Sequence, residues 1–281
     1  MVCSWLCMLD INGIPIFDRN YGIPQSHEFQ SSNAGLLFVI RQACQHGNFE
    51  MKQMATKDSQ IVIKEFECGR SGMTIILVTS DMSISIKALH AKLSLIWDAM
   101  VMILGEKTLG LRAHIIRSSI RLVSGLIDLL MEPSTGIQTA IGCPEILLPG
   151  SSKLINHVHE LSQHLGTGAC ALYYNKRLAV GTEMWHEMHA VDLLLLATFL
   201  ETNPSIKYRD MIIYLPHTSL GEGTVPGRQP YRLLTVRLMG ELEVVCLSAH
   251  AQLPESLVAI KNCCHHSIIN DFQRALPDLD R

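Results

Sequence analysis

The sequence predicts an α/β protein with two tandem domains, each a five-stranded antiparallel sheet flanked by helices. Signals for a strand hairpin, a helix, three strands and a further helix follow one another in the same order in both halves of the chain. A segment rich in proline and glycine, residues 133–150, separates the two halves. The chain has 281 residues and is 48% hydrophobic, which is enough apolar material for two cores.

The first half begins with strand signals on both sides of a short turn. Residues Val2–Leu9 are rich in large apolar side chains, and Asp10–Gly13 is typical of a tight turn. Ile14–Phe17 follows as a second strand. Its proline, Pro15, indicates a strand at the edge of a sheet, because proline has no backbone N–H to donate. Asn33–His46 then carries apolar residues at helical spacing and is followed by a glycine, which favours a helix end.

Three strands and two helices complete the first half. The strand-like runs are Glu50–Thr56, Gln60–Phe66 and Met73–Thr79. A helix with one apolar stripe is expected over Ile86–Leu104. A further continuous helix is expected over His114–Met131, since its apolar residues keep helical spacing throughout; they are Ile116, Ile120, Val123, Ile127 and Leu130.

The second half repeats this order after an extra helix at its start. That helix is expected to place its apolar residues on one face, namely Leu154, Ile155, Val158, Leu161 and Leu165. The expected elements are, in order, a helix over Ser151–Leu165, a hairpin of Ala169–Tyr174 and Arg177–Val180, an almost wholly apolar helix over Ala190–Glu201, strands at Met211–Leu215, Arg232–Leu238 and Leu242–Ala249, and a helix over Pro254–Leu276.

Two strands before a helix and three after it make up a five-stranded antiparallel sheet, whose apolar faces helices must cover. This is the arrangement of longin-like or roadblock-like domains. We therefore expect a first longin-like domain over residues 1–132, a linker over residues 133–150 and a second longin-like domain over residues 151–281.

The composition excludes several classes of function. With 23 Lys and Arg against 26 Asp and Glu, the net charge is −3, which gives no reason to expect a nucleic-acid partner. The sequence also has no run of like charges of the kind that binds an anionic membrane surface. Charged residues make up only 17% of the chain, so less of its surface has polar covering. Part of its apolar surface is then expected to meet a partner, the alternative being an unusually apolar monomer.

Membrane insertion and secretion are not expected either. The longest uncharged stretch, Leu161–Asn175, is shorter than the roughly 18 apolar residues that a spanning helix needs, and it contains polar side chains. The apolar start of the chain, Met1–Leu9, has no basic residue and is interpreted as a strand and not as a signal peptide. Nine scattered cysteines are most simply explained as reduced thiols of a cytosolic protein.

Candidate metal and catalytic motifs are weak. In His186-Glu187-Met188-His189 the two histidines are three residues apart, whereas the zinc-protease motif places them four apart on one helical face. In Cys263-Cys264-His265-His266 the residues are adjacent, so no helical face gathers four ligands. The pair Cys3 and Cys7 shares one face of a strand, which fits burial as well as ligation.

Phosphate binding and nucleophilic catalysis lack their motifs as well. The glycine-rich stretch Gly221–Gly227 precedes a strand, whereas a phosphate-binding loop precedes a helix. No G-x-S-x-G elbow and no P-loop lysine occurs. The sequence therefore favours a protein without a catalytic site of its own, without a cofactor and without a bound metal; a zinc-dependent hydrolase remains as a third class that rests only on the histidine and cysteine clusters.

Several motifs resemble the Fuzzy family of planar-cell-polarity proteins. The most specific is the run Ile213-Tyr214-Leu215-Pro216-His217-Thr218-Ser219, followed by Thr224-Val225-Pro226. The remaining motifs are Glu183-Met184-Trp185, Arg232–Val236, Leu242–Cys246, Gly13–Phe17, Ile63–Phe66, Ile75–Val78 and Ala99–Met102. Members of the family have three tandem longin domains, so the resemblance implies that the third family domain is absent here.

The resemblance implies a scaffold function. Fuzzy-type proteins pair with Inturned-like subunits and assemble with a Fritz-like WD-repeat subunit in the ciliogenesis and planar polarity effector complex. The pair resembles exchange factors for Rab-type GTPases, which leave the phosphate chemistry to the GTPase. Expected locations are the cytoplasm, the cytoskeleton, the ciliary basal body and the apical cell cortex. The alternative is a longin-type vesicle-trafficking adaptor that binds cargo peptides without exchange activity.

Candidate partner-binding residues lie on the second strand and first helix of the first domain, where paired longin proteins commonly have their dimer seam. They are Ile14, Ile16, Phe17, Leu36, Leu37 and Ile40. The residues themselves add a reason. Leu36–Ile40 are five apolar residues in succession, and one helical face cannot bury all five against a sheet. The alternative is that the loop Arg19–Ser32 folds over them.

Overall fold

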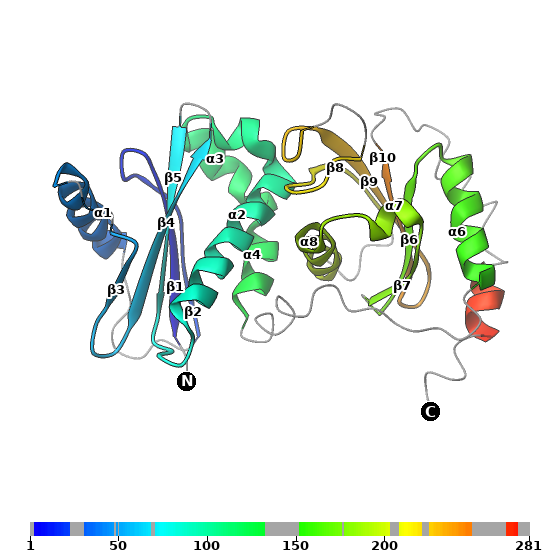
Figure 1. The fold of residues 1–281 in the computed structure, drawn as a ribbon, viewed down its shortest axis with the longest axis horizontal. Helices are drawn as coiled ribbons and strands as arrows, with labels where there is room; N and C mark the ends of the chain where they lie inside the picture. The colour runs from blue at the N-terminus through cyan, green and yellow to red at the C-terminus, as the bar shows by residue number, and fades with distance from the viewer. Residues whose placement is uncertain are drawn as a thin grey trace. The chain divides into compact units, whose positions relative to one another are not determined.

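The chain forms two compact units, Met1–Glu132 and Pro133–Arg281. The computed structural model describes residues 3–22, 31–47, 49, 51–68, 71–132, 152–175, 177–202, 208–220, 225–248 and 268–274. The predicted fold class is confirmed, because each unit contains a five-stranded antiparallel sheet with helices on both of its faces (Figure 1). The predicted linker, residues 133–150, lies outside the described residues.

The sheet of the first unit has the strand order β2-β1-β5-β4-β3, and all neighbours are antiparallel. Its strands are β1 (Ser4–Asp10), β2 (Pro15–Tyr21), β3 (Gln53–Ala55), β4 (Gln60–Cys68) and β5 (Ser71–Thr79). Pro15 lies on an edge strand, as predicted. The other edge strand, β3, is shorter than predicted, since only three of its residues pair with β4.

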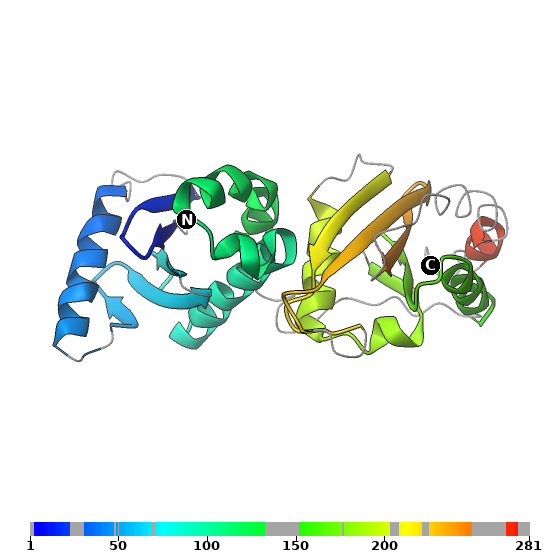
Figure 2. The ribbon, with the colours of Figure 1, turned by 90° about the horizontal axis from the view of Figure 1, so that it is seen from above.

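Helices cover both faces of this sheet (Figures 1 and 2). On one face α1 (Ser31–His46) packs Ala34 and Leu37 against Trp5, Cys7 and Leu9 of β1. The alternate residues of β1, which include Leu6 and Met8, are also fully buried and point to the opposite face. That face carries α2 (Ile86–Leu109), α3 (Ala113–Ser119), η1 (Ile120–Leu122) and α4 (Ser124–Met131). Burial on both faces explains why β1 is apolar at every position from Trp5 to Leu9 and does not alternate there.

The predicted continuous helix over His114–Met131 is wrong. The structure has α3, a 3-10 turn and α4 in its place. Serine hydroxyls lie at both ends of the break, where Ser118 donates to the carbonyl of Ile115 at 2.7 Å and Ser124 to that of Arg121 at 3.0 Å. Such side-chain bonds to the backbone compete with helix continuation. The apolar stripe is nevertheless buried as predicted, at Ile116, Ile120, Val123, Ile127 and Leu130.

Helix α2 is the long core helix of the first unit. Ser85 caps its start, accepting a hydrogen bond from the backbone N–H of Ala88 at 3.2 Å. By length and composition alone α2 is also apolar enough to cross a membrane, but 61% of its most apolar stretch is buried inside the molecule. Its packing on β4 and β5 accounts for this apolar character without a membrane (Figure 1).

A glycine bends α2 near its end. Gly105 has φ 73° and ψ 150°, a conformation that strains any residue with a Cβ atom. We expect Gly105→Ala to lower the free energy of unfolding by about 1–3 kcal/mol, measured by urea titration. Gly35→Ala in α1 is the matched control, since a Cβ there meets no atom within 4 Å and should be neutral or slightly stabilising. Equal stability of the two variants would contradict this account of the bend.

The second unit repeats the sheet with the order β7-β6-β10-β9-β8. Its strands are β6 (Ala169–Tyr174), β7 (Arg177–Gly181), β8 (Tyr208–Tyr214), β9 (Pro230–Met239) and β10 (Leu242–Ser248), and its helices are α6 (Ser152–His164), α7 (Glu183–His186), α8 (Ala190–Glu201) and a segment at 268–274. The β6–β7 hairpin turns at Asn175, which has φ 48° and is a residue type that tolerates this conformation.

One face of the second sheet packs against α6 and the helical segment at 268–274. The core there contains four of the five apolar residues predicted for the helix over Ser151–Leu165, namely Leu154, Val158, Leu161 and Leu165, together with Ile268 and Phe272. The fifth, Ile155, is 36% exposed, which corrects the predicted face. Only the 268–274 part of the predicted helix Pro254–Leu276 lies within the described residues.

Helix α8 lies on the other side of this sheet (Figure 1) and is buried nearly all round, as its sequence predicts. Its last carbonyls are bound by Arg209 of β8, which donates to Leu200 at 3.0 Å and lies over the ring of Phe199 at 5.2 Å. A cation at the carboxyl end of a helix also interacts favourably with the helix dipole. The arginine therefore fixes the end of α8 to the edge of the sheet.

Candidate protein-interaction surface

The described part of the chain brings no group of three or more His, Cys, Asp and Glu side chains together as a metal site would. His186 ends α7, whereas His189 is the N-cap of α8 and accepts a hydrogen bond at Nδ1 from the backbone N–H of Val191 at 3.2 Å. This bond gives His189 a structural role. The cluster Cys263–His266 lies outside the described residues.

The glycine-rich stretch and Cys7, the other candidate features, have structural explanations. The described end of the glycine-rich stretch Gly221–Gly227 leads into strand β9, as predicted. Cys7 is fully buried in β1, and burial raises the pKa of its thiol to about 12. A thiol with so high a pKa stays protonated at neutral pH and is a poor nucleophile and metal ligand.

A buried carboxylate holds the run Ile213–Ser219, the most specific of the motifs. Asp192 of α8 is fully buried and accepts hydrogen bonds from the backbone N–H of His217 at 3.2 and 3.3 Å. The hydroxyl of Thr218 bonds to the same carboxylate and also accepts the backbone N–H of His189 at 2.9 Å. The loop after β8 is thus tied to the start of α8, which gives this motif a structural function.

The stability contribution of Asp192 should depend on pH. Burial raises the pKa of this carboxyl, whereas the hydrogen bonds from Thr218 and His217 lower it by a smaller amount. A carboxyl with a raised folded-state pKa stabilises most below its unfolded pKa of about 3.9, and this contribution is lost as the pH rises through the folded pKa. We expect urea unfolding to show the wild type losing stability relative to Asp192→Asn as the pH rises from about 4 towards 7. If the free energy of unfolding of the wild type relative to Asp192→Asn stayed constant or grew with pH, burial would not be the main influence on the pKa of Asp192.

Helix α1 has one face in the core and another that faces outward. Ala34 and Leu37 point to the sheet, whereas Leu36 and Val39, on the other side, are 61% and 62% exposed. Ile40 is partly exposed. This confirms that one helical face does not bury all five residues of Leu36–Ile40. We call Leu36, Val39 and Ile40 the outer α1 face.

A buried arginine anchors α1 to the sheet. Arg41 is 4% exposed, forms an ion pair with Glu65 of β4 and donates to the hydroxyl of Thr74 on β5 at 2.8 Å. The aromatic ring of Phe38 lies against the turn between β1 and β2, where a Cβ on Gly13 would come within 2.6 Å of it. These contacts fix α1, so its outer face is presented on a rigid support.

The structure separates the six predicted partner-binding residues into two groups. Leu36 and Ile14 are exposed and Ile40 is partly exposed. Ile16, Phe17 and Leu37 are buried in the first unit, so they do not form a surface in this conformation. Phe17 pairs with Met8 and therefore points to the face that α2, α3 and α4 cover. Val39 is a surface residue that the sequence reasoning missed, although its spacing of three from Leu36 could have indicated it.

The edge of β2 carries features that discourage pairing with another strand. The register shifts between Met8 and Leu9, which leaves Ile16 without a partner and makes a bulge next to Pro15. Arg117 of α3 donates to the carbonyl of Pro15, and Arg19 pairs with Asp128 of α4. The exposed side chains of the outer α1 face are therefore better candidates for partner contact than the backbone of this edge. The predicted alternative, the loop Arg19–Ser32, falls largely outside the described residues.

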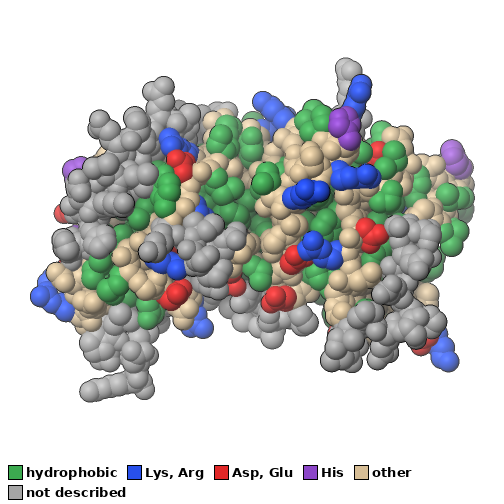
Figure 3. Space-filling model, turned by 180° about the vertical axis from the view of Figure 1, so that it is seen from behind, with side chains coloured by type: hydrophobic (Ala, Val, Ile, Leu, Met, Phe, Trp, Pro, Cys, Tyr) green, Lys and Arg blue, Asp and Glu red, His purple; other side chains and the backbone are tan. Residues whose placement is uncertain are grey.

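Apolar and charged side chains are mixed on the surface. Figure 3 shows hydrophobic side chains interspersed with Lys, Arg, Asp and Glu on the face that it presents. Charges of both signs agree with the net charge of −3.

No protein-family model matches the chain. It is similar to curated proteins named protein fuzzy homolog from Homo sapiens and Mus musculus, each 27% identical over 247 residues, and from Rattus norvegicus, 26% identical over 247 residues. Each match covers 86% of this chain and 57% of the relative, so the chain spans little more than half the length of these proteins. The matches confirm the resemblance to the Fuzzy family that the motifs indicate.

Proposed function

We propose that this chain is a non-catalytic scaffold subunit that acts in planar cell polarity and ciliogenesis, as its resemblance to the Fuzzy family implies. Two findings support the proposal. The matches to protein fuzzy homologs cover 86% of the chain. The two tandem sheets with flanking helices agree with the longin-like architecture that the resemblance implies.

The observation that carries the proposal is the outer α1 face. Leu36 and Val39 expose more than half of their surface on a helix that Arg41 anchors in the core. Contiguous exposed apolar side chains on a rigid element are typical of protein–protein interfaces. In the proposal this face pairs with an Inturned-like subunit, and the pair assembles with a Fritz-like WD-repeat subunit.

The proposed biochemical activity belongs to the pair and not to this chain. The pair acts as an exchange factor that opens the switch loops of a Rab-type GTPase, and the GTPase supplies the phosphate chemistry. Such a factor needs no cofactor and no catalytic side chain. The complex works in the cytoplasm, at the cytoskeleton, the ciliary basal body or the apical cell cortex, where recruitment to membranes is peripheral.

A nucleotide-release assay tests this activity. The chain, an Inturned-like subunit and the co-purified pair are each added to a Rab-type GTPase loaded with a fluorescent GDP analogue. We expect faster release with the pair and the intrinsic rate with either subunit alone. Pairing without faster release would favour the vesicle-trafficking adaptor, whereas full activity of the unpaired chain would contradict the proposal. Metal analysis of the purified chain separates both from a zinc-dependent hydrolase.

A further inference from the structure

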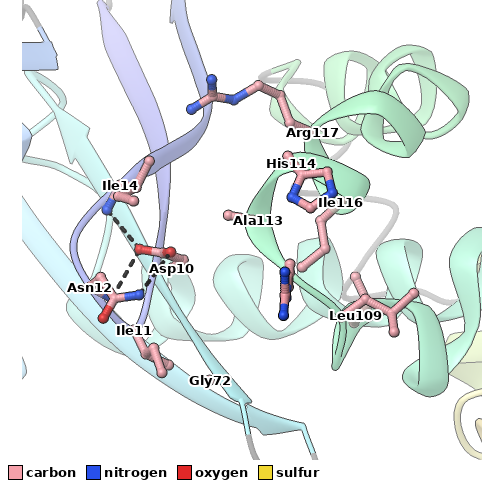
Figure 4. Close-up of a pocket in the computed structure, with 12 residues that line it drawn as sticks. Asp10, Ile11, Asn12, Ile14, Gly72, Leu109, Ala113, His114, Ile116 and Arg117 are labelled. Atoms are coloured by element: carbon pink, nitrogen blue, oxygen red, sulfur yellow. Dashed lines mark hydrogen bonds between the residues drawn. The ribbon is translucent and has the colours of Figure 1, made fainter.

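A hollow of about 500 Å³ lies in the first unit, on the other side of the β1–β2 turn from α1. Figure 4 shows it between the turn, with Asp10, Asn12 and Ile14, and the segment from the end of α2 into α3, with Leu109, Ala113 and Ile116. We call it the turn–α3 groove.

The walls of the groove are apolar and in part exposed. Ile11 and Ile14 of the turn are 53% and 47% exposed, and Leu111 opposite them is 46% exposed. The deeper residues Leu109 and Ile116 are buried. Three half-exposed aliphatic side chains around one hollow are a surface that gains from being covered by another apolar group.

The charge of the groove is one-sided. Arg112, His114 and Arg117 line it from α3 and the residue before it, and Asp10 is its one acidic lining residue, all of them within the described residues. The carboxylate of Asp10 is occupied by the turn, because it accepts the backbone N–H groups of Asn12 at 2.9 Å and Ile14 at 2.7 Å. In Figure 4 these two bonds hold the turn on one side while Arg117 reaches across from α3 on the other.

Both walls are rigid before any ligand binds. The turn is closed by Asp10 and by the Phe38 ring against Gly13, and Arg117 donates to the carbonyl of Pro15. The backbone N–H of Gly110 donates to the carbonyl of Glu106, which closes the end of α2 after the bend at Gly105. A preformed site costs less conformational entropy on binding.

We propose that the turn–α3 groove binds a short acidic and apolar peptide segment of a partner protein. One or two carboxylates of the segment pair with Arg112 and Arg117, and a neighbouring aliphatic or aromatic side chain of the segment enters between Ile14 and Ile116. Charge complementarity selects this occupant: the arginines repel a basic segment, and the aliphatic walls favour a peptide over a free anion. The proposal does not depend on the proposed pairing, which uses the outer α1 face.

Selection from a phage-displayed library of random dodecapeptides on the full chain tests the proposal. We expect enriched peptides to share one or two Asp or Glu residues next to a large apolar residue. The best peptide is then labelled with fluorescein, and its binding is measured by anisotropy at low and high salt. Binding should weaken with salt, because an ion pair contributes to it.

Two variants with matched controls locate the site. Arg112→Glu with Arg117→Glu, and separately Ala113→Trp, which fills the groove, should each weaken binding of the peptide at least about tenfold. Arg121→Glu and Leu122→Trp change exposed residues that do not line the groove and should leave binding unchanged. No enriched consensus, a basic consensus, equal binding by Ala113→Trp, or binding to vesicles of anionic lipid in preference to the peptide would overturn the proposal.

Discussion

Leu195→Asp is expected to abolish soluble expression of the chain. Leu195 of α8 is 0% exposed, and the helix around it is buried on nearly all sides. Removing a buried leucine side chain costs about 2–5 kcal/mol, and burying a carboxylate without a partner adds a further cost. Native domains are stable by only about 5–15 kcal/mol, so the second unit should unfold.

The measurement is the soluble yield, with the thermal unfolding of any soluble protein. Ile212→Asp is the control, because Ile212 of the same unit is 57% exposed and an exposed substitution changes stability by about 0.5 kcal/mol or less. Leu194→Asp, at another buried position of α8, should behave like Leu195→Asp. Normal solubility of both α8 variants would show that this helix is a docking surface and not a core helix.

Phe17→Asp combined with Leu37→Asp is expected to unfold the first unit. Each side chain is 8% exposed, and the two lie on opposite faces of the sheet. One substitution therefore places a charge under α2 and α4 and the other places a charge under α1. The summed cost exceeds the stability of an ordinary domain.

Circular dichroism and limited proteolysis of the first unit within the full chain check this result. Leu36→Asp is the control. Leu36 is next to Leu37 in the sequence but lies on the outer α1 face, so this variant should keep the unit folded. A folded double variant that has lost only its pairing would contradict the burial of Phe17 and Leu37 and would restore them as interface residues.

The order and type of most elements are readable from the sequence because local signals and tertiary burial agree. Trp5–Leu9 of β1 is apolar without alternation and helix α8 is almost wholly apolar, and both are buried on nearly all sides. The break within His114–Met131 was not predictable from periodicity, because the buried stripe continues through it. The serine hydroxyls that mark the break also occur on the exposed sides of unbroken helices.

The candidate surface was less predictable than the fold. Pro15 correctly indicates an edge strand. An edge position leaves the backbone of a strand unpaired on one side, but it does not decide whether the side chains are exposed. The burial of Ile16 and Phe17 depends on which helices cover the two faces of the sheet. That cover comes from α1, which follows β2 in the sequence, and from α2, α3 and α4, which are far away in the sequence. Likewise the spacing within Leu36–Ile40 indicates that some residues remain outside, and only the structure shows that Leu36 and Val39 do.

Pairing through the outer α1 face is the central claim, and co-purification with a tagged Inturned-like subunit measures it most directly. The test variant is Leu36→Asp with Val39→Asp, and the control is Leu122→Asp, a change at a 71% exposed residue of the same unit. The account predicts that the double variant unfolds at the wild-type temperature but binds at least about thirtyfold more weakly, a loss of about 2 kcal/mol, while the control binds normally. Undiminished pairing by the folded double variant would contradict it.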